Sequence, residues 1–139
     1  MISVLVVDDN GPVRRSLRDL LETADDIKLV ATATNGIEAV EKARSYRPDI
    51  AVIDISMPLM DGIEATEHIR ECCRLTRVII ISGFKDSEYV RHALEVGAKG
   101  YVLKDTAAND LLEGIRRVDS GKYYFSHQIA EFAEKYLPR

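Results

Sequence analysis

Short runs of apolar residues recur along this chain of 139 residues, and they carry no polar residue at alternate positions. Val4–Val7 and Val78–Ile81 are two such runs, both rich in Val and Ile. A strand with one face in water alternates apolar and polar residues, whereas a strand of a parallel sheet is covered by helices on both faces and stays apolar throughout. The chain is therefore predicted to be an α/β protein built on a parallel sheet.

Stretches with helical spacing separate the apolar runs. Leu111, Ile115 and Val118 have the i, i+4, i+7 spacing of an amphipathic helix. Helix start signals agree, because Asn35 and Asp61 are each followed by Glu three residues later. We predict strands at about residues 2–7, 28–33, 49–53, 77–81 and 100–103, and helices at about 12–23, 36–45, 62–72, 87–96 and 107–119. The expected fold is a doubly wound, five-stranded parallel sheet with helices on both faces.

The character of the sequence changes after Gly121, so we divide the chain into a domain at 1–121 and a C-terminal segment at 122–139. We expect an extra helix in this segment, with Ser126 as its N-cap. The apolar residues of the segment follow helical spacing: Ile129, Phe132, Ala133, Tyr136 and Leu137. Two interpretations stay open, namely a helix packed on its own domain and an interdomain linker or partner-binding helix of a larger protein.

Charge and hydropathy exclude two classes of function. The chain has 19 Lys and Arg against 23 Asp and Glu, a net charge of −4, and it lacks the basic stripe of a nucleic-acid binder. Arg14-Arg15 and Arg116-Arg117 are interpreted as solvated helix faces. No apolar run approaches the roughly 20 residues of a membrane span, and the N-terminus carries no export signal. We therefore expect a cytoplasmic protein that binds neither membranes nor, through these residues, DNA.

Groups suited to phosphoryl chemistry follow the apolar runs. Asp8 and Asp9 follow the first run, and Asp54, Ser82 and Lys104 follow three later ones. Ligands of open α/β sheets bind beyond the carboxyl ends of the strands, where these groups would meet. Each has an ordinary explanation by itself, such as a turn for the acidic pair or a helix cap for Ser82. Their common position at strand ends favours one shared site.

The chemistry of these side chains predicts a role for each. The carboxylate of Asp54 can attack phosphorus and carry the phosphoryl group as an acyl phosphate. Because two anions repel, we expect Mg²⁺ or Mn²⁺ on the oxygen ligands of the acidic pair beside it. Lys104 would neutralise the phosphoryl oxygens, and Ser82 would donate a hydrogen bond to them. Gly83 has no side chain and leaves room for a substrate.

Five segments together form a specific pattern: Val6-Val7-Asp8-Asp9, Val52-Ile53-Asp54-Ile55-Ser56-Met57-Pro58, Met60-Asp61-Gly62, Ile81-Ser82-Gly83 and Gly100-Tyr101-Val102-Leu103-Lys104-Asp105. In these segments the chain resembles the receiver domain of bacterial two-component response regulators. The resemblance runs from residue 2 to about 121. It implies the CheY-like fold, a relative of the flavodoxin fold, and a signalling protein that assists only its own phosphorylation and dephosphorylation.

The resemblance also implies partners and residue roles. A sensor histidine kinase would donate the phosphoryl group, and a phosphorylation-dependent homodimer would be the output. Tyr101 would be the switch aromatic, which turns inside when Ser82 moves toward the phosphoryl group. The implied phosphoacceptor is Asp54, the implied metal ligands are Asp8, Asp9, Asp54 and the backbone carbonyl of Ser56, and the implied phosphoryl contacts are Ser82, Gly83 and Lys104.

The finer pattern resembles the NarL/FixJ subfamily, because Asp105 follows Lys104 and the run Leu111–Val118 matches as well. Members of that subfamily usually carry a C-terminal helix-turn-helix domain that binds DNA, and this chain ends at Arg139, before such a domain. We expect a fragment of a transcription regulator, with a stand-alone CheY-like receiver as the alternative. An aspartyl-phosphate hydrolase is a weaker alternative, since such enzymes carry a second Asp where this chain has Ser56.

Overall fold

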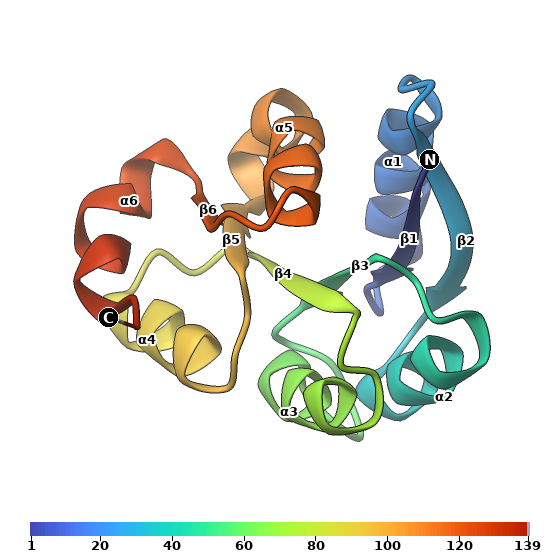
Figure 1. Cartoon of the computed structure of the whole chain (residues 1–139), viewed down its shortest axis with the longest axis horizontal. Coiled ribbons are helices and arrows are strands. Elements are labelled where there is room, and N and C mark those ends of the chain that lie inside the picture. The colour runs from blue at the N-terminus through green and yellow to red at the C-terminus, as the bar shows by residue number, and fades with distance from the viewer. Residues whose placement is uncertain (139) are drawn as a thin grey trace.

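Figure 1 shows the computed structural model of the protein, which describes residues 1–138. Within these residues one sheet contains six strands in the order β2-β1-β3-β4-β5-β6, and every neighbouring pair is parallel. The strands are β1 (Ile2–Val7), β2 (Ile27–Ala33), β3 (Ile50–Asp54), β4 (Arg77–Ser82), β5 (Gly100–Leu103) and β6 (Tyr124–Phe125). The predicted α/β fold with a parallel sheet is confirmed.

The sheet differs from the prediction by one strand, β6. This strand pairs with β5 at two positions, Gly100 with Tyr124 and Tyr101 with Phe125. A strand of two residues is too short to show any periodicity, and for this reason the sequence pattern assigns the stretch to no element. The C-terminal segment therefore joins the edge of the sheet before its helix begins.

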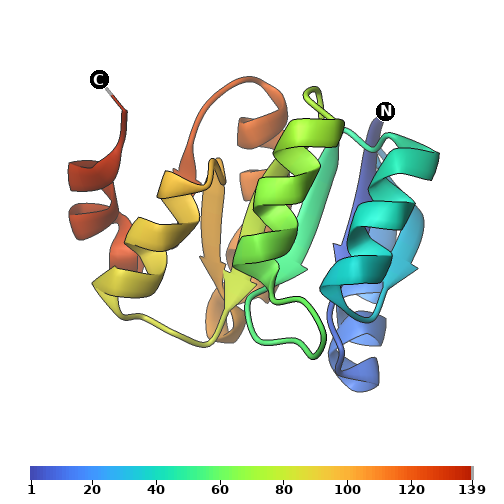
Figure 2. The same cartoon turned by 90° about the horizontal axis from the view of Figure 1, so that it is seen from below.

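Helices cover both faces of the sheet (Figure 1). Helices α1 and α5 lie on one face, and α2, α3 and α4 lie on the other. Figure 2 shows α6 beside α4, at the β6 edge. The helices are α1 (Gly11–Glu22), α2 (Gly36–Tyr46), α3 (Gly62–Cys72), α4 (Ser87–Glu95), α5 (Ala107–Asp119) and α6 (His127–Ala133). None of the helices in residues 1–138 has the length and apolarity needed to cross a bilayer.

The apolar runs of the sequence become central strands that are buried on both faces. In β1, Val4 and Val6 contribute to the core under α1 and α5, whereas Leu5 and Val7 contribute to the core under α2, α3 and α4. All four side chains are fully buried. This double burial explains the missing polar alternation, and it fixes the end of β1 in the middle of the sheet.

All three predicted N-cap residues stand at helix starts, but only two of them cap the helix with their side chains. Oδ1 of Asn35 accepts a hydrogen bond from the backbone of Glu38 at 2.9 Å, and Oδ1 of Asp61 accepts one from Glu64 at 2.9 Å. Ser126 stands before α6 but makes no capping bond with its side chain. Its hydroxyl is instead bonded to groups on β5 and α5.

The extra C-terminal helix is present as α6, followed by a 3₁₀ turn at Glu134–Tyr136. Ile129 and Ala133 of α6 are fully buried and belong to the core under α4. Of the two interpretations left open by the sequence, α6 has the packing of a helix on its own domain. The boundary at residue 121 and a linker role for the segment stay predictions.

Candidate functional site

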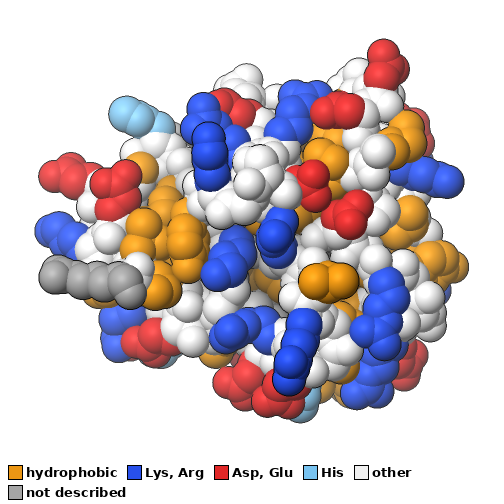
Figure 3. Space-filling model, viewed as in Figure 1, with side chains coloured by type: hydrophobic (Ala, Val, Ile, Leu, Met, Phe, Trp, Pro, Cys, Tyr) orange, Lys and Arg blue, Asp and Glu red, His pale blue; other side chains and the backbone are white. Residues whose placement is uncertain are grey.

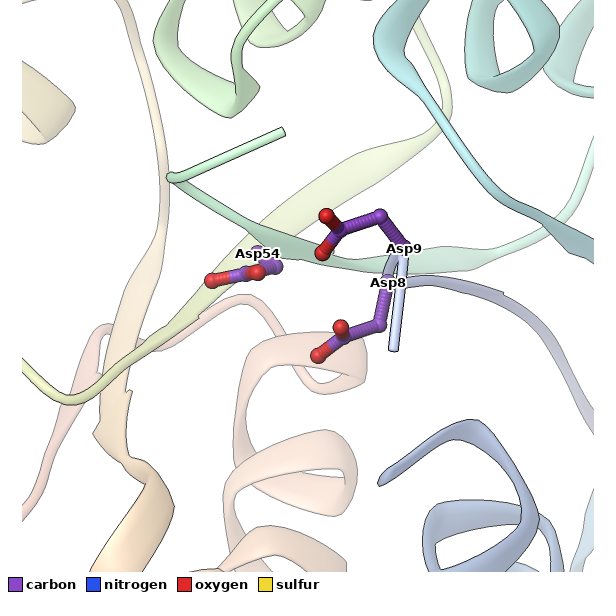
Figure 4. Close-up of side chains that lie close together, drawn as sticks. All are labelled: Asp8, Asp9 and Asp54. Atoms are coloured by element: carbon purple, nitrogen blue, oxygen red, sulfur yellow. The ribbon is translucent and has the colours of Figure 1, made fainter. Parts of the chain in front are cut away.

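Three charged residues meet where strands β1, β3 and β5 end. Asp8 follows β1, Asp54 is the last residue of β3, and Lys104 follows β5. The neighbouring strands β1 and β3 end at nearly the same level, because Val7 pairs with Ile53. Figure 4 shows the carboxylates of Asp8, Asp9 and Asp54 gathered at this edge, and one oxygen of each lies within 4.8 Å of the others. The structure thus brings together the acidic residues that the sequence assigns to one site.

Asp8 is fully buried, and its neighbours hold its carboxylate in place. Oδ1 accepts a hydrogen bond from the backbone N–H of Asn10 at 2.9 Å. Oδ2 lies 3.2 Å from Nζ of Lys104, yet no group among the described residues donates a well-formed hydrogen bond to it. A buried carboxylate oxygen with so few partners is suited to a further cation.

Lys104 forms an ion pair with both buried carboxylates. Its Nζ lies 3.2 Å from Oδ2 of Asp8 and 3.3 Å from Oδ2 of Asp54. Burial by itself would lower the pKa of Lys104, but the attraction of Asp54 and Asp8 outweighs burial and raises that pKa above its ordinary value. Lys104 therefore carries a full positive charge at neutral pH.

Asp54 is almost completely buried, at 4% exposure. Burial and then repulsion from Asp8 raise the pKa of Asp54 to about 6, against the opposing effects of Lys104 and of the backbone N–H of Ser56. The pKa stays raised although an ammonium group lies beside the carboxylate. One lysine does not compensate the negative charge of the cluster.

The cluster fits a divalent metal ion. Asp8, Asp9 and Asp54 offer carboxylate oxygens, the ligands that Mg²⁺ and Mn²⁺ prefer. Oδ2 of Asp8 lacks a good hydrogen bond, and Asp9 is exposed, so the cluster is open to solvent on that side. A bound cation would favour the ionised form of Asp54. The backbone carbonyl of Ser56 as a further ligand stays a prediction.

Ser82 and Gly83 border the site at the end of β4, which is paired with β3. Ser82 is fully buried, and its Oγ accepts a hydrogen bond from the backbone N–H of Phe84 at 2.9 Å. A Cβ atom built on Gly83 would meet no atom within 4 Å. A side chain of one carbon would therefore fit at this position, and the role of Gly83 in leaving room for a substrate stays a prediction.

Tyr101 on β5 lies with its ring fully buried. Its hydroxyl donates a hydrogen bond to the carbonyl of Phe84 at 2.8 Å. Burial raises the pKa of Tyr101 to about 12, although the hydroxyl of Ser82 acts in the opposite direction. The resemblance to receiver domains implies that this ring turns inside after phosphorylation. In the structure the ring already occupies the inner position, next to Ser82 and Phe84.

Two further residues support the end of β1 and the start of α1. Arg14, interpreted as part of a solvated face, donates a hydrogen bond from its guanidinium to the carbonyl of Asp8 at 2.7 Å. Asn10 caps α1 by accepting a hydrogen bond from the backbone of Val13 at 3.0 Å. An Asn just before Gly-Pro is a helix-start signal that identifies the role of Asn10. The sequence offers no comparable signal for Arg14.

Comparison with known proteins decides the family. The sequence model of the response regulator receiver domain matches residues 4–116 of the chain. The chain belongs to this family. The receiver domain predicted from sequence motifs is thus confirmed, and the phosphoacceptor role of such domains is general to the family.

Relatives agree on the kind of regulator. The transcriptional regulatory protein LnrK of Bacillus subtilis (strain 168) is 40% identical over 121 residues, which cover 87% of this chain and 55% of that protein. The crystal structure of a two-component response regulator of the LuxR family from Aurantimonas sp. SI85-9A1 matches with a TM-score of 0.92 at 33% identity, over 97% of this chain and 96% of that one. The signal receiver domain of the putative response regulator NarL from Mycobacterium tuberculosis has a TM-score of 0.84 at 30% identity, over 87% and 98% of the two chains.

These matches agree with the resemblance to the NarL/FixJ subfamily. The chain spans little more than half the length of the curated relatives that it matches. Membership of the family therefore describes this chain as a receiver domain, and it does not extend to the other half of those relatives.

Proposed function

We propose that this receiver accepts a phosphoryl group on Asp54 from a sensor histidine kinase in a magnesium-dependent reaction. The observation that carries the proposal is the position of the Asp54 carboxylate. It lies 3.3 Å from Nζ of Lys104, and one of its oxygens is within 4.8 Å of oxygens of Asp8 and Asp9. A nucleophile, a cation for phosphoryl oxygens and a set of metal ligands are thus close together.

The transfer follows from the chemistry of these groups. A carboxylate oxygen of Asp54 attacks the phosphorus of a phosphohistidine, the P–N bond breaks as the new O–P bond forms, and the product is an acyl phosphate. Asp54 is ionised for this attack at neutral pH, since its pKa is about 6. Lys104 neutralises charge on the phosphoryl oxygens. Asp8, Asp9 and Asp54 would hold a magnesium ion, which would supply further positive charge for the phosphoryl oxygens.

The proposal extends to the output of the switch. The phosphoryl group attracts the hydroxyl of Ser82, and this favours the inner position of Tyr101 that the structure shows. Such a two-state change remodels nearby surfaces and promotes homodimer formation. In support, a cleft of about 320 Å³ between α1 and α5 is lined by Val13, Leu17 and Leu20 and extends to Lys104. Apolar side chains next to the site offer a surface for a second copy.

Control of transcription is the proposed final effect. The relative LnrK is named a transcriptional regulatory protein, and the chain covers 55% of its length. We infer that DNA binding belongs to a helix-turn-helix domain outside this chain. The receiver itself has a net charge of −4, which does not favour contact with the phosphate backbone of DNA.

The proposal is tested with acetyl phosphate, which donates a phosphoryl group without a kinase. The protein is incubated with acetyl phosphate and Mg²⁺, and its intact mass is measured. We expect the mass of one phosphoryl group in the wild type and in the exposed control Asp25→Asn, and no gain in Asp54→Asn or after chelation of Mg²⁺. A gain that persists in Asp54→Asn would refute Asp54 as the acceptor.

A further inference from the structure

Ser126 connects the C-terminal segment to the strand that ends at Lys104. Its backbone N–H donates a hydrogen bond to the carbonyl of Tyr101 at 3.1 Å. Its Oγ accepts a hydrogen bond from the backbone N–H of Leu103 at 2.9 Å. Strand β6 ends at Phe125, so the serine hydroxyl takes the place of the next strand carbonyl and extends the β5–β6 pairing by one step. Ser126 is fully buried, as this role requires.

Asp110, in the first turn of α5, completes the connection. The hydroxyl of Ser126 donates a hydrogen bond to Oδ2 of Asp110 at 2.7 Å, and the hydroxyl of Thr106 donates to the same oxygen at 3.2 Å. The Ser126 hydroxyl thus donates a hydrogen bond to a carboxylate while it accepts one from the backbone N–H of Leu103. Bonds of this charge-assisted kind are stronger than neutral ones.

The bonded groups lie on both sides of Lys104 in the chain. Leu103 precedes it, and Thr106 closes the 3₁₀ turn Lys104–Thr106. Both ends of this turn are therefore held by hydrogen bonds. The backbone N–H of Leu103, just before the turn, is bonded to Ser126, and the hydroxyl of Thr106, at its end, is bonded to Asp110. The ammonium of Lys104 must stay within about 3.3 Å of two carboxylates, and a flexible side chain keeps such a position only if its backbone is fixed.

We propose that Ser126 is a positioning residue for Lys104 and couples the phosphorylation site to the described part of the C-terminal segment, residues 122–138. The inference rests on the proposed function of Asp54 and Lys104. A phosphoryl group that binds the ammonium of Lys104 favours the ordered Lys104–Thr106 turn. The ordered turn then favours the hydrogen bonds to Ser126. Coupling of this kind is reciprocal, so an ordered C-terminal segment also strengthens phosphoryl binding.

Beryllofluoride, a mimic of the phosphoryl group, gives the test. Its affinity in the presence of Mg²⁺ is measured by calorimetry for the wild type, Ser126→Ala, Ser126→Thr and the matched control Ser120→Ala. Ser120 lies just after α5, and within residues 1–138 its hydroxyl donates only to the carbonyl of Arg117. We expect a three- to tenfold loss of affinity in Ser126→Ala, because the substitution removes both hydrogen bonds of the hydroxyl and part of that loss reaches Lys104. We expect rescue in Ser126→Thr and no change in Ser120→Ala.

The same Ser126→Ala substitution in a Lys104→Ala protein distinguishes positioning of Lys104 from a general loss of stability. In Lys104→Ala the residue that Ser126 positions is gone, so Ser126→Ala should lower beryllofluoride affinity no further. The same loss in both backgrounds, or unchanged affinity of Ser126→Ala beside a wild type that binds, would overturn the inference. A wild type that does not bind beryllofluoride would overturn the proposed function and the inference with it. If Ser126→Ala does not fold, Thr106→Val removes the second donor to Asp110, and the same two comparisons decide.

Discussion

Asp54 is nearly buried, yet it must be ionised to attack phosphorus, and burial disfavours the ionised form of a carboxyl group. Burial raises the pKa of Asp54 to about 6, and Lys104 at 3.3 Å offsets only part of this increase. The sequence predicts which residues meet here, because their positions at strand ends follow from the topology. It does not predict the pKa of Asp54, which depends on burial and on the distance to Asp8.

The raised pKa predicts how Asp54 affects stability. The folded carboxyl has a pKa of about 6 against an ordinary value of 3.8, so its contribution to stability is complete below pH 4 and is lost as the pH rises through 6. In EDTA, Asp54→Asn should be more stable than the wild type above pH 6 by at most about 3 kcal/mol. The difference should shrink toward pH 4.

Urea unfolding of both proteins between pH 4 and 8 measures this difference. Adding Mg²⁺ is the internal control, because a bound cation stabilises the wild type more than a variant that lacks one carboxylate. A wild type that is more stable than Asp54→Asn at pH 7 in EDTA would contradict the assigned pKa.

A second prediction concerns two glycines near the site. A Cβ atom on Gly62 would overlap the carbonyl of Asp54, whereas one on Gly83 would meet open space. Gly62→Ala should therefore lower the free energy of unfolding by about 1–3 kcal/mol and slow phosphorylation from acetyl phosphate, because the backbone of Asp54 has to shift. Gly83→Ala is the matched control and should change stability by less than about 0.5 kcal/mol. Equal effects of the two substitutions would contradict the close packing of Gly62 on Asp54.

At the scale of elements, the C-terminal segment packs against the receiver domain. β6 extends the sheet beyond β5, and α6 buries Ile129 and Ala133 beside α4. Helical periodicity predicts α6 from sequence, because its apolar residues recur with a clear spacing. β6 and the role of Ser126 are not predicted, since a two-residue strand has no period and a hydroxyl that bonds a neighbouring strand resembles a helix cap in sequence.

The contribution of α6 to the fold is measured with paired substitutions of isoleucine. Ile129 is fully buried, whereas Ile37 on α2 is 45% exposed. Ile129→Ala should lower the free energy of unfolding by about 2–5 kcal/mol, because it leaves a cavity in the core. Ile37→Ala should cost much less. Chemical denaturation of the two variants gives the comparison, and a loss for Ile129→Ala no larger than that for Ile37→Ala would mean that α6 does not stabilise the domain.

At the scale of the whole molecule, charge is divided between the two ends of the sheet. Carboxylates gather where the strands end. Lys and Arg side chains gather where the strands begin, in the middle of the side of the molecule that Figure 3 shows, and a pocket there is lined by Arg70, Arg74, Arg77 and Lys99. Two of these cations donate hydrogen bonds to carbonyls at helix ends: Arg70 to that of Val96 and Arg77 to that of Asp119. Helices that follow the strands have their positive ends toward the site, where they favour a phosphoryl group.

Dimer formation is the prediction at this scale. With Mg²⁺ and beryllofluoride, sedimentation should show a higher mass than without them. Leu20→Glu in the α1–α5 cleft should prevent the increase and leave beryllofluoride binding intact, because a carboxylate in an apolar interface is costly. Leu75→Glu is the matched control, as Leu75 is 92% exposed and lies after α3. An increase in mass that survives Leu20→Glu would place the dimer on another surface.

The most direct test locates the phosphoryl group in the chain. Borohydride reduces an aspartyl phosphate to homoserine, and peptide mass mapping then identifies the converted residue. After incubation with acetyl phosphate and Mg²⁺, we predict homoserine at position 54 and at no other aspartate. Conversion at Asp8 or Asp9, or no conversion in a protein that has gained the mass of a phosphoryl group, would contradict the account.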